Sequence, residues 1–259
     1  IFIVSINDAT DALRGGLYFL PRKLSFACYA DILTRETFLH GIWITVLRTV
    51  IGTPLAVLVT TMLAYVLSRE DLLWKKPLNL LFIFTMYFGG GMVPYYMVLK
   101  NLGMLNNFIV FIFPNLVSVY NMILVKNYIE GMPKEIFESS KIDGANDLTV
   151  FFRMVLPLSK PIIMTIALFV AVMHWNSWFD AYLYTNSQSL KTMQSILVEI
   201  LNQYQTSSAN QAANQAGQQL TPDSIRMAAT MIATIPIIMV YPFIQKYFVK
   251  GIMLGSVKS

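Results

Sequence analysis

The sequence is short of charged residues. Of its 259 residues only 13% are Asp, Glu, Lys or Arg, whereas 56% are hydrophobic. A soluble domain of this length would carry about 25% charged residues. This deficit, together with apolar runs of spanning length, argues against a soluble domain and is typical of a chain that lies in a bilayer.

Cysteine and histidine are scarce as well. The single cysteine, Cys28, excludes an internal disulfide and a cysteine-rich metal site. The two histidines, His40 and His174, lie far apart without a partner at ligand spacing, so we expect no zinc site. The formal net charge of +5 does not indicate nucleic acid, because the basic residues are dispersed and such an excess in a membrane protein usually reflects positive-inside topology.

Five apolar runs are long enough to cross a membrane: residues 41–67, 78–99, 108–125, 161–184 and 224–249. Residues 1–6 form a short apolar stub, which we interpret as the end of a span that begins before this sequence. We therefore expect an all-α fold, a polytopic transmembrane helical bundle of six spans with the first truncated here. Residues 1–259 would form a single transmembrane domain.

Two of the runs contain residues that disturb a simple helix. Arg48 lies near the start of the first run, where its side chain can reach the interface, and Pro54 should kink that helix. In the second run, three glycines at 89–91 and Pro94 indicate a helix that is broken or closely packed. A hinge or gate and close packing through small residues both remain open for this segment.

The basic residues predict the sidedness. If the spans alternate, the turn at 68–77, the polar segment 126–160 and the C-terminal tail lie on one side and hold eleven of the 19 Lys and Arg residues. The positive-inside rule makes this side cytoplasmic. The segment 185–223, rich in Gln, Asn and Ser, is then an external loop, either a flexible linker or a contact for a partner protein.

The polar segment 126–160 reads as two short helices. Pro133 followed by Lys and Glu favours a helix start, and Gly144 favours its end, since glycine tolerates the left-handed conformation. Residues 145–147 form a small polar turn with capping character before a second helix over about 148–156. Pro157 then leads the chain toward the next span. These features predict a helix–turn–helix at the cytoplasmic face.

This segment resembles the EAA loop of ABC importer permeases. The family pattern is Glu-Ala-Ala, three residues, Gly, nine residues, Ile, one residue and Leu-Pro. Here Glu138 and Gly144 match, both alanines are serine, and Met154 replaces the isoleucine before Leu-Pro. Residues 141–145 and 245–251 resemble the carbohydrate-uptake branch, in particular subunits similar to the smaller maltose permease subunit and permeases for longer or acidic oligosaccharides.

The resemblance implies a permease subunit of a binding-protein-dependent oligosaccharide importer, a multi-pass protein of the bacterial inner membrane that forms half of the translocation pathway. It implies a homologous second permease, two ATPase subunits and an extracytoplasmic substrate-binding protein as partners, beside oligosaccharide and membrane lipid. The chain itself would be no enzyme and would bind no cofactor, with ATP and Mg on the ATPase subunit. No G-x-x-x-x-G-K-[ST] motif occurs in the sequence, which agrees.

The resemblance also assigns a coupling surface to this segment. Glu138 would make polar contact with the ATPase, Gly144 would permit the sharp turn, and Leu156 with Pro157 would fix the second helix against the membrane. The alternative is an amphipathic interfacial helix that packs on its own bundle. The full set of expected coupling residues is Glu138, Ser139, Ser140, Asp143, Gly144, Ala145, Leu156 and Pro157.

A second group of polar and aromatic residues lies late in the run 161–184. Aromatic faces and planar polar groups suit sugar binding, and a polar residue within a span favours a functional site. An aromatic belt at the external interface is the other interpretation. Asn176 and Asp180 lie four residues apart and would share a helix face. The candidate substrate-path residues are Trp175, Asn176, Trp178, Asp180 and Tyr182.

Two other functions remain as alternatives. An ABC importer permease for another solute, such as an amino acid or phosphate, would keep the same coupling segment. An ion-coupled secondary transporter commonly needs acids within the membrane, and only Asp180 qualifies, near the end of a span. A membrane-embedded enzyme is a third alternative, but the sequence contains no metal-binding or catalytic-nucleophile pattern that supports it.

Overall fold

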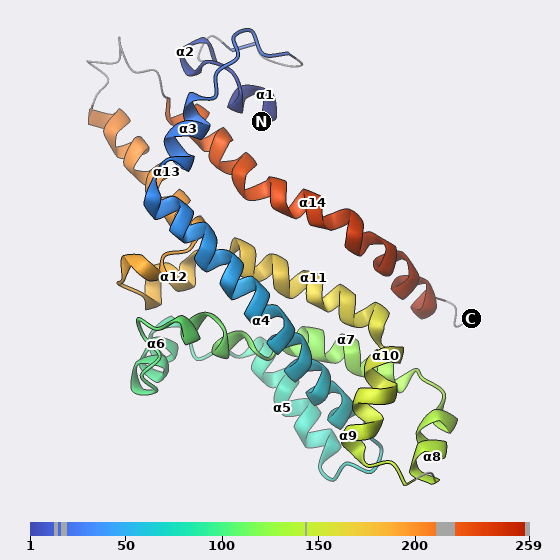
Figure 1. The fold of residues 1–259 in the computed structure, drawn as a ribbon. Coiled ribbons are helices and arrows are strands. Elements are labelled where there is room, and N and C mark those ends of the chain that lie inside the picture. Colours follow the sequence, from blue (N-terminus) through green and yellow to red (C-terminus); the bar gives the residue numbers. More distant parts are fainter. Residues whose placement is uncertain (13–14, 17–19, 143, 211–220, 257–259) are drawn as a thin grey trace. The chain divides into compact units, whose positions relative to one another are not determined.

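The computed structural model describes the chain except for residues 13–14, 17–19, 143, 211–220 and 257–259 (Figure 1). The described residues form helices and no β-strand, so the predicted all-α fold is confirmed. The chain makes two compact units, residues 1–47 with 175–241 and residues 48–174 with 242–259. The unit boundaries fall within helices, and the single domain over 1–259 stays a prediction.

Unit 1 is built around the first turns of α13 (Met193–Asn210). Its elements are α1 (Phe2–Ser5), α2 (Ala9–Ala12), α3 (Ala27–Leu33), the start of α4 (Glu36–Ser68), the end of α11 (Lys160–Asn176), α12 (Phe179–Tyr184), η4 (Gln188–Leu190), α13 (Met193–Asn210) and the first part of α14 (Pro222–Ser256). Its core is made by Cys28, Ile32, Phe38, Met193, Ile196, Leu197, Ile200, Ile225, Ala228 and Ala229.

Unit 2 contains the rest of α4 and the predicted polar segment. Its further elements are α5 (Lys75–Tyr87), α6 (Met92–Asn101), η1 (Phe108–Phe111), η2 (Phe113–Asn115), α7 (Val119–Glu130), α8 (Lys134–Ile142), α9 (Asp147–Val150), the π-helical turn η3 (Phe151–Val155), α10 (Leu156–Leu158), most of α11 and the last part of α14. Its core is made by Ala64, Tyr65, Leu67, Met122, Val125, Ile129, Val150, Phe151, Val155 and Ile166.

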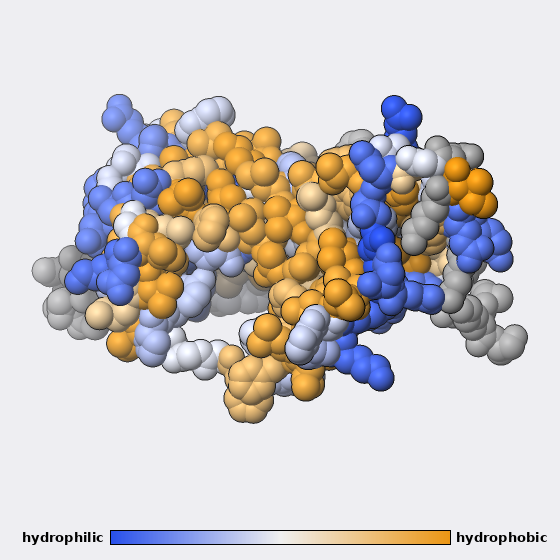
Figure 2. All heavy atoms as spheres, turned by 90° about the horizontal axis from the view of Figure 1, so that it is seen from below, coloured by the Kyte–Doolittle hydropathy of each residue, from blue (hydrophilic) through white to orange (hydrophobic). Residues whose placement is uncertain are grey.

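The described helices account for up to five membrane spans. α4 and residues 223–240 of α14 are each long and apolar enough to cross a bilayer. Three bent pairs pass the same test together: α5 with α6, η1–η2 with α7, and α9–α10 with α11, at 113°, 43° and 82°. Exposed apolar side chains cover much of the surface visible in Figure 2, as expected for a protein that contacts lipid. Each of these elements overlaps one of the five predicted runs, and three of them are bent pairs; α9 and α10 lie before the run 161–184, within the predicted polar segment.

The break between α5 and α6 coincides with the three glycines. Gly91 adopts a φ of +87°, a conformation that favours glycine, and directly precedes α6. No described atom lies within 4 Å of a Cβ built at Gly89. The prediction of a broken helix is therefore confirmed, and among the described residues only Pro94, in the following turn, comes within 4 Å of a Cβ built at Gly90 or Gly91.

Arg48 does not reach the interface, contrary to our expectation. Its side chain is fully buried, with the guanidinium carbon 4.7 Å from the centre of the Phe111 ring. The negative face of an aromatic ring offers a cation a favourable position inside the protein. Gly52, one turn later, faces His174, whose Nε2 lies 2.6 Å from a Cβ built at the glycine. This stretch of α4 therefore packs inside unit 2.

The expected loop 185–223 contains a helix, which corrects the prediction. α13 (Met193–Asn210) buries Met193, Ile196, Leu197 and Ile200 in the core of unit 1. These residues follow the i, i+3, i+4, i+7 spacing of an amphipathic helix, a pattern that the surrounding Gln and Asn residues obscured. Much of the glutamine-rich part of this segment lies outside the described residues, and its external location stays a prediction.

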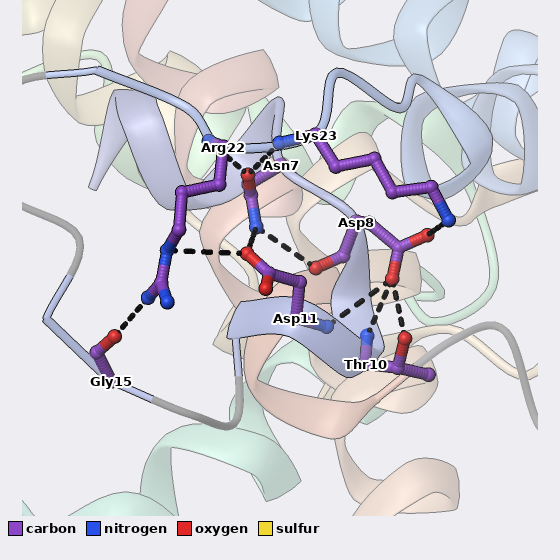
Figure 3. Close-up of polar contacts among 7 residues, drawn as sticks. All are labelled: Asn7, Asp8, Thr10, Asp11, Gly15, Arg22 and Lys23. Carbon is purple, nitrogen blue, oxygen red and sulfur yellow. Dashed lines mark hydrogen bonds and ion pairs between the residues drawn. The ribbon is translucent and has the colours of Figure 1, made fainter.

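A polar cluster closes the N-terminal turn of unit 1 (Figure 3). The buried Asn7 amide oxygen accepts the backbone N–H groups of Arg22 and Lys23 at 2.9 and 3.0 Å, and its nitrogen donates to Asp11 at 3.0 Å. Asp8 accepts the Thr10 hydroxyl, pairs with Lys23 at 3.1 Å and accepts the Asp11 backbone N–H; these contacts hold its pKa well below the ordinary value. The side chains of this turn thus hold its two ends together.

Candidate functional site

The first helix of the polar segment forms as predicted. α8 begins at Lys134, directly after Pro133, and ends at Ile142. Gly144 has a φ of +74°, and the Ala145 backbone N–H donates to the Ser140 carbonyl at 3.0 Å. No described atom lies within 4 Å of a Cβ built at this left-handed glycine, so the backbone conformation alone favours glycine here.

The hydroxyl groups of the two serines that replace alanine form hydrogen bonds within α8. Ser139 Oγ donates to the Ile136 carbonyl at 3.1 Å, and Ser140 Oγ donates to the Phe137 carbonyl at 2.8 Å. Ser140 is 2% exposed, and a buried hydroxyl without a partner would be costly. Because each bond stays within α8, the helix keeps its shape, and the buried Ser140 packs as a small residue.

The second helix also begins as predicted. Asn146 Oδ1 accepts the Thr149 backbone N–H at 2.8 Å, which caps α9. The helical path then continues through η3 and α10 to Leu158. Val150, Phe151 and Val155 are buried in the core of unit 2, so this face anchors the polar segment to the spans.

A cleft of about 470 Å³ lies beneath α8 within unit 2. Its walls come from the end of α4, the following turn, the start of α5, the end of α7, and α8 and α9. Phe137 and Glu138 line it from α8, Lys75 from α5 and Glu130 from α7. The cleft therefore lies where the polar segment meets the ends of three membrane helices.

Ion pairs connect the walls of this cleft. Arg69 binds Asp71 through Nε and Nη2 at 2.8 and 2.5 Å, and its Nη1 pairs with Asp147. The hydrogen bond to Asp71 raises the pKa of the Arg69 guanidinium, burial opposes the rise, and Asp147 adds to it. Lys75 pairs with Glu130 at 3.0 Å, joining α5 to α7. Charged contacts thus link the end of α4 to α9, and α5 to α7.

The predicted coupling residues divide into exposed and anchoring groups. Glu138, Ser139, Gly144 and Pro157 are exposed, while Ser140 is buried, and Ala145 and Leu156 pack against the core of unit 2. Asp143 lies outside the described residues.

Sequence reasoning missed Arg69 and Asp147 as part of this site. They are far apart in the sequence and belong to no shared motif. The one available signal was the position of Arg69 at the end of a span, next to two acids.

The candidate substrate-path residues do not share one helix face. The helix α11 ends at Asn176 and α12 begins at Phe179. Asp180 Oδ1 accepts the Ser177 hydroxyl at 2.8 Å and the Ala181 backbone N–H at 2.9 Å. Such local side-chain bonds compete with helix continuation. The expected common face of Asn176 and Asp180 is therefore wrong, because a break separates them.

The aromatic residues of this group have different environments. The Trp175 indole donates to the Ala233 carbonyl at 3.0 Å and packs against the core of unit 1. Trp178 and Tyr182 are exposed, with ring centres 6.0 Å apart. Asn176 accepts a hydrogen bond from Gln194 at 3.3 Å. Trp175 therefore has a structural contact, while the exposed pair suits either sugar stacking or an interfacial aromatic belt.

Comparisons with known proteins agree over most of the chain. Residues 25–254 match the family described as "Binding-protein-dependent transport system inner membrane component". The polygalacturonan/rhamnogalacturonan transport system permease protein YtcP of Bacillus subtilis (strain 168) is 40% identical over 261 residues, covering 100% of this chain and 91% of the relative. The arabinooligosaccharides permease AraQ of Halalkalibacterium halodurans is 25% identical over 268 residues, covering 100% and 89%.

A solved structure is similar as well. It is the crystal structure of a bacterial ABC transporter involved in the import of the acidic polysaccharide alginate. The matched chain has a TM-score of 0.83 at 26% identity, and the match covers 95% of the present chain and 88% of that one. The similarity extends over both units of the fold.

Proposed function

Because this chain belongs to the family of inner-membrane components of binding-protein-dependent transport systems, we propose that it is the permease subunit of an ATP-driven importer of acidic oligosaccharides. In this role it forms half of the pathway through the bacterial inner membrane. A homologous second permease forms the other half. A substrate-binding protein outside the membrane delivers the sugar, and two separate ATPase subunits, which bind ATP and Mg, supply the energy.

One observation supports the coupling role most directly. The segment from α8 to α10 presents Glu138 on an exposed helix, turns at the left-handed Gly144, and buries its second helix in the core of unit 2. An exposed helix on a firmly anchored base suits a docking surface for a soluble partner. We name residues 134–158 the docking segment, and assign Glu138, Ser139 and Gly144 to its contact side. Ser140, Ala145 and Leu156 belong to its base, Pro157 to the exposed side of the second helix, and Asp143 to the turn.

The proposed substrate class rests on the relatives. YtcP is named for polygalacturonan and rhamnogalacturonan, and the similar structure belongs to an alginate importer. These polymers carry uronic acids, so their fragments are oligosaccharides with carboxylates. The exposed Trp178 and Tyr182 can stack on the apolar faces of sugar rings, while the exposed Asn176 and the half-buried Asp180 provide polar contacts. Trp175 would position this group from the core.

The experiment reconstitutes the chain with its partner permease, ATPase subunits and binding protein in lipid vesicles. We expect ATP-dependent uptake of radiolabelled trigalacturonate and little uptake of maltotriose, lysine or phosphate. Glu138→Arg should reduce co-purification of the ATPase subunits while the permease pair still assembles. Uptake of maltotriose, lysine or phosphate in preference to trigalacturonate would overturn the substrate class. Undiminished ATPase binding by Glu138→Arg and by a variant with residues 134–142 replaced by a Gly-Ser linker would overturn the docking assignment.

A further inference from the structure

Arg69 occupies a junction between two elements that sequence motifs do not connect. It directly follows α4, whose last residue Ser68 bonds its hydroxyl to the Tyr65 carbonyl at 2.7 Å. The Arg69 backbone N–H reaches the Val66 carbonyl at 3.4 Å. The backbone of Arg69 is therefore held at the end of α4, and contacts of its side chain connect that helix end to other elements.

The guanidinium of Arg69 is held by two carboxylates on different elements. Asp71 takes Nε and Nη2 in a bidentate pair, which fixes the plane of the guanidinium. Nη1 remains for Asp147, the first residue of α9. The Arg69 side chain is 24% exposed, and those of Asp71 and Asp147 are 53% and 63% exposed. The three groups therefore form an ion-pair network at the protein surface rather than a buried ion pair; we call this network the clamp.

Apolar contacts join the same two elements just above the clamp. Tyr65 and Leu67 of α4 share the core of unit 2 with Val150 and Phe151 of the docking segment. The rings of Tyr65 and Phe151 lie 5.7 Å apart. Apolar packing of this kind resists separation of two helices but is non-directional, whereas a bidentate pair fixes orientation. The ion pairs of Arg69 therefore fix the orientation of the docking segment relative to α4, which apolar packing alone does not.

We propose that Arg69 is a positioning residue that transmits movement of the docking segment to α4. The proposal rests on the proposed function, since it requires that an ATPase moves residues 134–158. When that segment moves, Asp147 pulls on the guanidinium, and Asp71 keeps the guanidinium aligned with the end of α4. α4 then follows the segment. Loss of the clamp leaves docking intact and makes ATP hydrolysis less productive.

Arginine is required at this position by the geometry. The clamp uses three nitrogens of one planar group toward two carboxylates. A lysine ammonium is a point charge on a flexible stem and cannot hold a bidentate pair and a third contact in fixed directions. Arg69→Lys should therefore behave as an intermediate between the natural chain and Arg69→Gln.

The test measures uptake of trigalacturonate and ATP hydrolysis in the same vesicles, with the complete complex. We expect Arg69→Gln and Asp147→Asn each to lower the sugar transported per ATP by about three- to thirtyfold, the range in which residues that carry coupling act. The double variant should lose no more than the stronger single variant, because both remove one contact. ATPase co-purification should be unchanged, which a merely destabilised fold would not allow.

Two matched controls separate the clamp from general loss of charge. Arg35→Gln removes an arginine paired with Asp31 at 2.8 Å within one region of unit 1, and Asp223→Asn removes an acid from the first turn of α14. Both should transport as the natural chain does.

The outcomes distinguish this proposal from the docking assignment. A transport ratio for Arg69→Gln and Asp147→Asn within twofold of the controls overturns the clamp, as do fully additive losses in the double variant. If the linker replacement of residues 134–142 also leaves ATPase binding and transport unchanged, the docking assignment itself is wrong. If that replacement abolishes ATPase binding while Arg69→Gln is neutral, docking stands and the clamp alone is refuted.

Discussion

Substitution of Gly144 gives a graded test of the docking turn. The residue has a φ of +74°, and nothing described lies within 4 Å of an added Cβ, so a side chain meets backbone strain without a clash. The left-handed conformation costs an L-residue about 1–2 kcal/mol, least for Asn and most for β-branched residues. We expect ATPase affinity to fall in the order Gly, Asn, Ala, Val. The strain corresponds to about a 5–30-fold lower population of the turn for Val.

The measurement is a titration of purified ATPase subunit onto vesicles that contain this chain and its partner permease. An affinity scales with the populated fraction of the binding-competent turn, so Gly144→Val should raise the apparent Kd by about 5–30-fold. Gly103 is the matched control, because it has a φ of +68° and equally open space but lies outside the docking segment. The reasoning is refuted if Gly144→Val binds like Gly103→Val, or if Asn weakens binding more than Val.

Three further substitutions test the packing and the N-terminal turn. Gly41→Ala places a Cβ 2.5 Å from Ile196 Cδ1 and 3.2 Å from the Met193 backbone nitrogen, so we expect about 1–3 kcal/mol of destabilisation, measured as a lower Tm in detergent. Phe151→Ala empties a buried site in unit 2 and should cost about 3–5 kcal/mol in denaturant unfolding. Asp8 has a lowered pKa, so its contribution is present above the ordinary carboxyl pKa and is lost as the pH falls through the lowered value. Limited proteolysis of the N-terminal turn should therefore accelerate in acid for the natural chain, and Asp8→Asn should be cleaved faster already at neutral pH, with a flatter pH profile.

The sequence predicted the docking segment well because its signals are local. The helix start after Pro133, the left-handed Gly144 and the second helix from residue 147 each depend on a few neighbouring residues. Helix caps and glycine turns depend on the adjacent backbone, so they can be predicted from the sequence without knowledge of the tertiary structure.

The features that were missed depend on distant residues. Arg48 lies inside the protein because Phe111, far along the chain, offers its ring face. Residues 193–200 form a helix because unit 1 buries their apolar face, although the surrounding composition is typical of a linker. The bond between Ser177 and Asp180 lies at a break between α11 and α12, within an apolar run that composition alone predicts as continuous. Hydropathy predicts which segments lie in the membrane, but it does not predict which distant residues contact one another.

The length of α4 has a mechanical consequence. Its 33 residues extend over about 50 Å, while the hydrocarbon core of a bilayer is about 30 Å thick. Confining the whole helix to that core would need a tilt of more than about 50°, beyond the range of about 0–40° found for membrane helices. The ionised groups of Arg69, Asp71 and Asp147 favour water at the Ser68 end. One end of α4 should therefore extend beyond the hydrocarbon core, and the charged groups after Ser68 favour the end next to the docking segment.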